Sequence, residues 1–293
     1  MSKLLVKPKN ENTYQDIIPS KAKWQHLTFK AQSLKEDETF ESNTGDSEIL
    51  IVLLGGNFSV SSNVGDFKTI NGRKDVFSGY PHALYLPRGT SYTLTANSPT
   101  LDIALGMAPV EKTYPPHFVT PDTIQERGIE IRGGDNATRQ INPILPPGSE
   151  CEKLVCVEVY TPSGNWSSFP AHKHDTRKVS PEGKITEAAL EETYFYKIDK
   201  PNGFAIQRVY TDDRELDEVM VAENNDVVLV PKGYHPVVAG HGYNVYYLNF
   251  LAGSDQSLAN SDDPHHKWVY DSWKSKDPRI PLTTKDGARK HEV

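Results

Sequence analysis

Short apolar runs, separated by turn residues, recur along most of the chain and constrain its fold more than any other feature. Each run has the length of a β-strand and is rich in β-branched or aromatic residues. No long stretch has the apolar spacing of an amphipathic helix. The 20 glycines and 21 prolines among 293 residues suit a fold with many turns. The sequence therefore predicts an all-β fold, with runs at residues 49–54, 83–86, 91–96, 101–105, 154–160, 204–210, 226–230 and 243–250.

A weak internal repeat predicts two copies of one β-barrel unit. Residues 84–92 and residues 228–235 each contain a strand-like run that ends in Pro-basic-Gly and is followed by a polar ring residue. Upstream of each copy an acidic residue opens an apolar run, Glu48 in the first half and Glu192 in the second. Self-similarity of this kind indicates duplication of a structural unit.

The stretch 128–150 reads as the connection between the two copies, because glycines and prolines break its periodicity. We therefore expect an N-terminal barrel over residues 1–140 and a C-terminal barrel over residues 141–273. Residues 274–293 form a polar tail, which we expect to be disordered or to act as an oligomer arm.

Charge and composition exclude several classes of protein. The net charge of −7, without a strong basic run, argues against nucleic acid as a partner. The longest apolar stretch, residues 49–54, is too short to span a membrane, and the N-terminus lacks the apolar core of a signal peptide. Two cysteines, Cys151 and Cys156, fit a reduced compartment. We expect a cytoplasmic protein.

A group of metal-ligating residues lies in the second half. His172 and His174 are two residues apart, so an extended strand would point both imidazoles to one side. Two surface histidines are the alternative explanation for this pair. Glu192 begins a later run and His235 follows the Pro-Lys-Gly turn, so the four residues could close around one ion with open positions left for substrate. The first half has Tyr92 where the second has His235, and we expect no metal there.

The sequences around these residues resemble the two short motifs of the cupins, with longer spacing between His174 and Glu192. Segments 157–168, 171–175, 190–194, 207–214, 231–236 and 246–249 are similar to the 5-deoxy-glucuronate isomerase family of myo-inositol catabolism. A ketol-isomerase of pectin breakdown is a related enzyme. The resemblance implies a bicupin, with two jelly-roll barrels in one chain.

The resemblance also implies the chemistry of the site. Its ligands would be His172, His174, Glu192 and His235, with Glu192 preferred to Glu191 because it directly precedes the Thr-Tyr-Phe-Tyr run. We expect one divalent metal ion, Zn or Mn, a sugar-acid substrate and a homo-oligomer. The implied reaction converts 5-deoxy-D-glucuronate to 5-dehydro-2-deoxy-D-gluconate through an enediolate, whose negative charge a divalent ion would stabilise.

Four further residues are candidates for substrate contact. With Glu192 facing inward, strand alternation also turns Tyr194 inward, where it could serve a sugar oxygen or simply pack. Either Gln207 or Arg208 must face the barrel. An inward Arg208 could bind the substrate carboxylate, and the alternative is an arginine paired with a nearby aspartate. Arg139, in the connection, is a further carboxylate candidate.

Two other functions fit the same residues. A metal-dependent oxygenase would use iron and O2 at the same ligands. A non-catalytic bicupin would bind sugar acids, and its metal would only stabilise the barrel.

Overall fold

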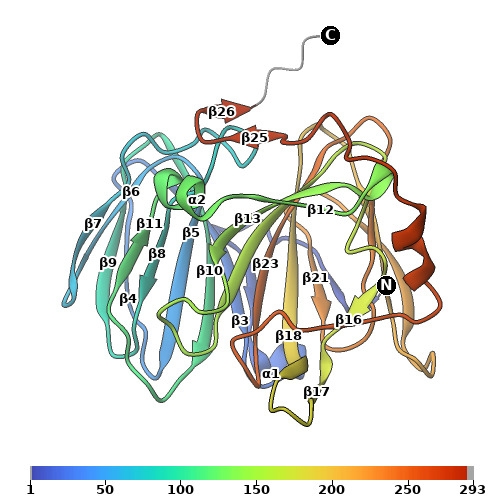
Figure 1. Cartoon of the computed structure of the whole chain (residues 1–293). Coiled ribbons are helices and arrows are strands. Elements are labelled where there is room, and N and C mark those ends of the chain that lie inside the picture. The colour runs from blue at the N-terminus through green and yellow to red at the C-terminus, as the bar shows by residue number, and fades with distance from the viewer. Residues whose placement is uncertain (1, 289–293) are drawn as a thin grey trace.

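The computed structural model describes residues 2–288 and consists of two β-barrels that lie side by side (Figure 1). All of the pairings between its strands are antiparallel. The apolar runs form strands, which confirms the predicted all-β fold. These strands are β5 (Ser47–Gly55), β8 (Ala83–Leu86), β9 (Ser91–Ala96), β10 (Thr100–Pro109), β14 (Val155–Thr161), β19 (Ala205–Tyr210), β21 (Val227–Val230) and β23 (Val245–Gly253).

The first barrel is formed by a six-stranded and a four-stranded sheet. The larger sheet has the order β11-β8-β5-β10-β3-β2, and the smaller has the order β4-β9-β6-β7. Alternation along β9 sends Tyr92, Leu94 and Ala96 into the core between the two sheets. The remaining strands are β2 (Thr13–Ile17), β3 (Thr28–Lys35), β4 (Thr39–Asn43), β6 (Phe58–Ser62), β7 (Gly65–Lys68) and β11 (His117–Val119).

The second barrel has the same two-sheet plan. Its larger sheet has the order β1-β21-β18-β23-β14-β13-β12, with β17 also paired to β18, and its smaller sheet has the order β15-β22-β19-β20. The strands not yet described are β1 (Leu5–Val6), β12 (Glu130–Arg132), β13 (Arg139–Leu145), β15 (Trp166–Ser167), β17 (Asp175–Val179), β18 (Ile185–Ile198), β20 (Asp217–Ala222) and β22 (Val237–Ala239).

The stretch 128–150 is more than a connection, because it contains two strands of the second barrel. β13 pairs with β14, and β12 pairs with β13. The expected boundary at residue 140 therefore falls inside β13. Near the N-terminus, β1 pairs with β21 of the second barrel. We propose that the second barrel begins before β12 and includes β1.

The two larger sheets pack face to face and form the main core of the molecule. The rings of Phe29 and Phe250 lie 5.9 Å apart between their centroids, and those of Phe29 and Phe195 lie 5.4 Å apart. Because Phe29 comes from the first barrel and the other two come from the second, these contacts join the barrels. Burial of aromatic side chains on this scale is a large stabilising contribution.

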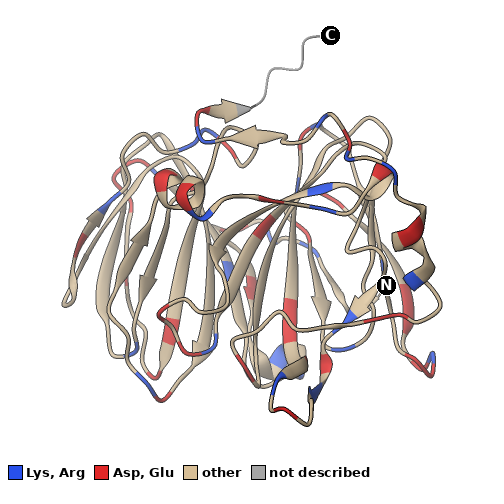
Figure 2. Ribbon diagram, in the orientation of Figure 1, with Lys and Arg blue, Asp and Glu red and all other residues tan. Residues whose placement is uncertain are grey.

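Short elements complete the fold. They are α1 (Pro19–Ala22), α2 (Pro121–Arg127), the 3-10 helices Asp135–Ala137 and Lys267–Ser272, and strands β16 (His172–Lys173), β24 (Ser261–Asp262), β25 (Thr283–Thr284) and β26 (Gly287–Ala288). Within residues 2–288, no helix is long and apolar enough to cross a membrane. Acidic and basic residues are interspersed over both barrels (Figure 2).

The described part of the polar tail packs against the barrels. Ile280 and Leu282 are buried in the main core. The side-chain oxygen of Gln140 accepts hydrogen bonds from the backbone N–H groups of Leu282 and Thr283, at 2.8 and 3.2 Å. Residues 274–288 are therefore ordered, and the expectation of disorder is wrong for them. Residues 289–293 lie outside the described part.

Candidate metal centre

Three of the four candidate ligands meet in the second barrel. Glu192 lies in the middle of β18, His174 follows β16, and His235 follows the turn after β21. The Nε2 atom of His174 lies 3.0 Å from Oε2 of Glu192, and the Nε2 atom of His235 lies 3.3 Å from the same oxygen. All three residues are buried, and their ligating atoms lie within 4.8 Å of one another. Two imidazoles and a carboxylate in this arrangement could hold a metal ion.

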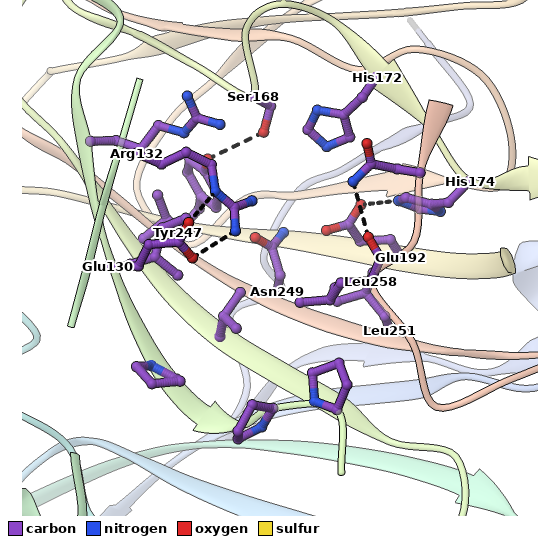
Figure 3. Close-up of a pocket in the computed structure, with 18 of the residues that line it drawn as sticks. Glu130, Arg132, Ser168, His172, His174, Glu192, Tyr247, Asn249, Leu251 and Leu258 are labelled. Carbon is purple, nitrogen blue, oxygen red and sulfur yellow. Dashed lines mark hydrogen bonds and ion pairs between the residues drawn. The ribbon is translucent and has the colours of Figure 1, made fainter. Parts of the chain in front are cut away.

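His172 lies at the edge of this group. Its ring centroid is 5.0 Å from that of His235, and it faces the same pocket as His174 (Figure 3). Lys173, between the two histidines, extends the other way and pairs with Asp212 and Asp175. The strand alternation expected for His172 and His174 is therefore present. His172 is not one of the residues whose ligating atoms lie within 4.8 Å of one another.

The orientation of His235 leaves a ligating atom available. Its Nδ1 lies 2.8 Å from the carbonyl oxygen of Gly233, so this nitrogen carries the proton and Nε2 has the free lone pair. That Nε2 is buried and makes no hydrogen bond to any residue from 2 to 288. Gly233 has φ +90°, and a Cβ there would lie 2.4 Å from the carbonyl oxygen of Tyr210. The turn therefore requires glycine, and the buried Nε2 fits a metal ion as its missing partner.

Burial favours the neutral ring in two of the three candidate histidine ligands, His172 and His235. Burial lowers the pKa of His235 to about 4. Burial, together with the two neighbouring histidines, also lowers the pKa of His172 well below its ordinary value. For His174, burial favours the neutral ring, but contact with Glu192 outweighs this and raises the pKa. Neutral imidazoles are the form that binds metal ions.

Three of the candidate ligands, His172, His174 and Glu192, line a cavity of about 330 Å³ in the second barrel. Tyr194 lies in its wall, as expected from alternation along β18, and its hydroxyl is 3.0 Å from that of Ser168. Burial, followed by the nearby Glu192, raises the pKa of Tyr194 well above its ordinary value. Tyr194 is therefore a neutral phenol that can donate a hydrogen bond to a ligand in the cavity.

Gln207 faces the interior of the barrel, and Arg208 does not. The side chain of Gln207 accepts a 2.7 Å hydrogen bond from the Tyr196 hydroxyl, and its amide lies 3.4 Å from the carbonyl oxygen of His235. Gln207 therefore contacts the backbone of His235 and does not line the cavity. Arg208 makes a two-pronged ion pair with Asp217, at 2.6 and 2.7 Å. Its position on the outer face corresponds to the alternative interpretation, an arginine paired with an aspartate.

Other cavity residues had little signal in the sequence. Ser168, Tyr247 and Asn249 line the cavity, but none belongs to a short motif with a fixed spacing. Tyr247 and Asn249 share one face of β23, and alternation could have identified them once Tyr247 was assigned to the inner face. Arg132 and Arg139 also line the cavity. Of these two, only Arg139 was a candidate from the sequence.

The strand register explains why the halves differ. Glu192 pairs with Val230, the last residue of β21, and Ile49 pairs with Leu86, the last residue of β8. The residue of the first barrel that corresponds to Glu192 is therefore Ile49, and Glu48 corresponds to Glu191. An apolar side chain at this position cannot bind a metal, so a single centre in the second barrel stays our prediction.

Two β-barrels in one chain, with a His/Glu/His group inside the second, define a bicupin. Comparison with known proteins gives the family. The model of the KduI/IolB family matches residues 4–269. The chain belongs to the KduI/IolB family.

Curated relatives and solved structures agree with this assignment. The chain is 40% identical to a 5-deoxy-glucuronate isomerase of Geobacillus kaustophilus, over 93% of this chain and 97% of the relative. It is 37% identical to the protein of the same name from Bacillus subtilis strain 168, over 92% and 99% of the two chains. The names of these relatives identify the chain as an enzyme of the isomerase class.

Among solved structures, an IolB-like protein from Salmonella typhimurium matches with a TM-score of 0.85 and 38% identity, over 91% of this chain and 98% of that chain. Oxalate decarboxylase from Bacillus subtilis matches with a TM-score of 0.61 and 12% identity, over 89% and 80% of the two chains. The second match concerns the fold alone.

Proposed function

We propose that this protein is a metal-dependent aldose–ketose isomerase that converts 5-deoxy-D-glucuronate to 5-dehydro-2-deoxy-D-gluconate in the cytoplasm, as a step of inositol catabolism. The name shared by its relatives supports the substrate. The observation that supports the mechanism most strongly is the buried Nε2 of His235, which faces Glu192 beside His174 without a hydrogen bond to any described residue.

We assign His172, His174, Glu192 and His235 as the ligands of one divalent ion. Zn and Mn both suit three imidazoles and a carboxylate, and they are the metals that we propose. When bound, such an ion would act as a Lewis acid that stabilises negative charge on the aldehyde and hydroxyl oxygens of the sugar.

The remaining wall residues would orient the sugar. The neutral hydroxyl of Tyr194, next to that of Ser168, can donate a hydrogen bond to a sugar oxygen as charge develops there. Asn249 lines the cavity and uses its amide to donate to the carbonyl oxygen of Thr193, at 3.2 Å, so its own side-chain oxygen is available to a hydroxyl group. Gln207 has a positioning role, because it contacts the backbone of His235 rather than the cavity.

The test is to incubate the pure protein with 5-deoxy-D-glucuronate in D2O and to follow the products by NMR. We expect the aldehyde signal to disappear, the ketose signals to appear, and deuterium from the solvent to enter the product. The rate should be the same with and without air, because no oxidant takes part. Absence of the ketose would overturn the proposed reaction, and a requirement for O2 would favour the oxygenase.

A further inference from the structure

We propose that Arg139, assisted by Arg132, forms the subsite that binds the carboxylate of the substrate. This inference rests on the proposed function and identifies which end of the cavity receives the acid group of the sugar. Both arginines come from the β12–β13 hairpin, which the chain inserts into the second barrel.

Arg139 is a buried cation that has no acidic ion-pair partner among the described residues. Only 4% of its surface is exposed, and its guanidinium donates to two backbone carbonyl oxygens, those of Ala137 at 3.4 Å and Phe169 at 3.2 Å. No carboxylate within residues 2–288 lies within 4.0 Å of its nitrogens. A buried charge without a counter-charge is costly, and a guanidinium has five N–H donors. Arg139 therefore has donors and charge available for an anion.

The neighbouring strand adds a second cation. Arg132 and Arg139 are directly opposite each other in the β12–β13 ladder, so their side chains lie on the same face. Arg132 makes a two-pronged ion pair with Glu130, at 2.6 and 2.7 Å. This face of the hairpin thus carries two guanidiniums and one carboxylate, which pairs with Arg132 alone, and like charges placed opposite each other are unfavourable. A bound carboxylate would supply the missing negative charge.

The subsite lies in the same cavity as the candidate ligands. Figure 3 shows Glu130, Arg132 and Tyr247 on one side of the cavity, with His174 and Glu192 on the other. The two sides are linked through Ser168, whose hydroxyl contacts that of Tyr194 and whose neighbour Phe169 receives the hydrogen bond from Arg139. A sugar acid in this cavity could therefore present its aldehyde to the ligands and its carboxylate to the arginines.

The geometry of arginine explains the selectivity that we expect. A guanidinium can make two parallel hydrogen bonds to a carboxylate, and such charged pairs are stronger than neutral ones. An uncharged carboxamide would satisfy some of the donors but would leave the buried charge unbalanced. The subsite should therefore distinguish a sugar acid from its neutral analogue mainly in binding, since it lies away from the reacting carbons.

The test compares Arg139→Met with the wild type on 5-deoxy-D-glucuronate and on its carboxamide. We expect KM for the acid to rise on the order of 30-fold or more, which corresponds to the loss of a charged hydrogen bond. We expect kcat for the acid to change by less than about threefold. For the carboxamide, we expect both KM and kcat to change by less than about threefold, because this analogue does not make the charged hydrogen bond. Arg139→Lys keeps the positive charge but cannot make two parallel hydrogen bonds, so its KM for the acid should lie between those of the wild type and Arg139→Met.

Arg88→Met is the control for loss of an arginine outside the cavity, although Arg88, unlike Arg139, pairs with an aspartate, Asp46. Arg88 also donates to two carbonyl oxygens, those of Val110 and Glu111, but it lies in the first barrel and should leave both substrates unaffected. Equal losses on acid and carboxamide in Arg139→Met would overturn the subsite while leaving the reaction in place. If Arg139→Met does not fold, Arg139→Lys and Arg132→Met decide the question by the same comparison. No turnover by the wild type would instead refute the proposed function.

Discussion

At the residue scale, the neighbouring residues Gln207 and Arg208 of β19 lie on opposite faces of the strand. Gln207 is buried under His235, and Arg208 lies on the outer face, where it also stacks on the ring of Tyr210 with its guanidinium carbon 4.4 Å from the ring centroid. The sequence predicts that one of the two faces inward, because a strand alternates, but it does not say which. The choice depends on partners that are distant in the sequence, such as Tyr196 for Gln207.

This placement predicts that Arg208→Met has little effect on catalysis. The substitution removes an exposed ion pair with Asp217, which is worth about 1 kcal/mol of stability or less. We expect KM and kcat for the sugar acid to stay within about twofold of the wild type, because no group in the cavity is changed. Steady-state kinetics would check this, and a large rise in KM would restore Arg208 as the carboxylate-binding residue.

His174 is the residue whose removal should separate activity from folding. His174→Ala deletes one candidate ligand from the cavity, whereas the apolar core of the second barrel is formed by other strands. We expect metal affinity to fall by more than the roughly 10- to 100-fold typical of a residue that only supports a ligand. Activity should disappear after dialysis against a chelator, with the far-UV circular dichroism retained. Near-native turnover in that sample would contradict a catalytic role for the metal.

At the scale of elements, two adjacent glutamates on β18 point in different directions and make different contacts. Glu192 points into the cavity, and Glu191 points to the first barrel, where its carboxylate accepts hydrogen bonds from the backbone N–H groups of Gln25, His26 and Leu27. Glu48 on β5 does the same in the opposite direction, and accepts from the N–H groups at 152–154. Each barrel thus contributes one carboxylate, Glu48 from β5 and Glu191 from β18, that accepts backbone hydrogen bonds from the other barrel.

Glu191→Ala should therefore destabilise the contact between the barrels. The substitution leaves three N–H groups without their charged acceptor, and we expect the free energy of unfolding to fall by about 2–4 kcal/mol. Urea denaturation followed by tryptophan fluorescence would measure the change. Glu38→Ala is the control, because Glu38 accepts one hydrogen bond within an exposed turn, from the N–H group of Lys35. Similar losses in the two variants would show that Glu191 does not join the barrels.

At the scale of single elements, local pattern predicted strands with a clear apolar run and missed others, among them β3, β12, β13 and β1. Runs such as 49–54 and 243–250 contain enough β-branched and aromatic residues to be recognised alone. β12 and β1 have three and two residues, and they become strands only because β13 and β21 pair with them. Glycines and prolines break the sequence pattern around β12 and β13, so these strands were not predicted. The two strands contribute both cavity arginines, Arg132 and Arg139.

At the scale of the whole molecule, one half holds the candidate site and the other supports it. The repeated turn made the duplication visible in the sequence, and the His-x-His pair, Glu192 and His235 marked the half with the site. The interface could not be predicted in this way, because it depends on the packing of two sheets. Gly106 of the first barrel, for example, lies so close to Phe250 that a Cβ would be 2.1 Å from the ring.

The central claim is that one metal centre, in the second barrel, carries the isomerisation. The most direct test is to strip the protein with a chelator, add back Zn or Mn in steps, and measure conversion of 5-deoxy-D-glucuronate to the ketose at each step. Our account predicts no turnover without metal, followed by a rise that reaches its plateau at one ion per chain. Full turnover by the stripped protein, or a plateau at two ions per chain, would contradict it.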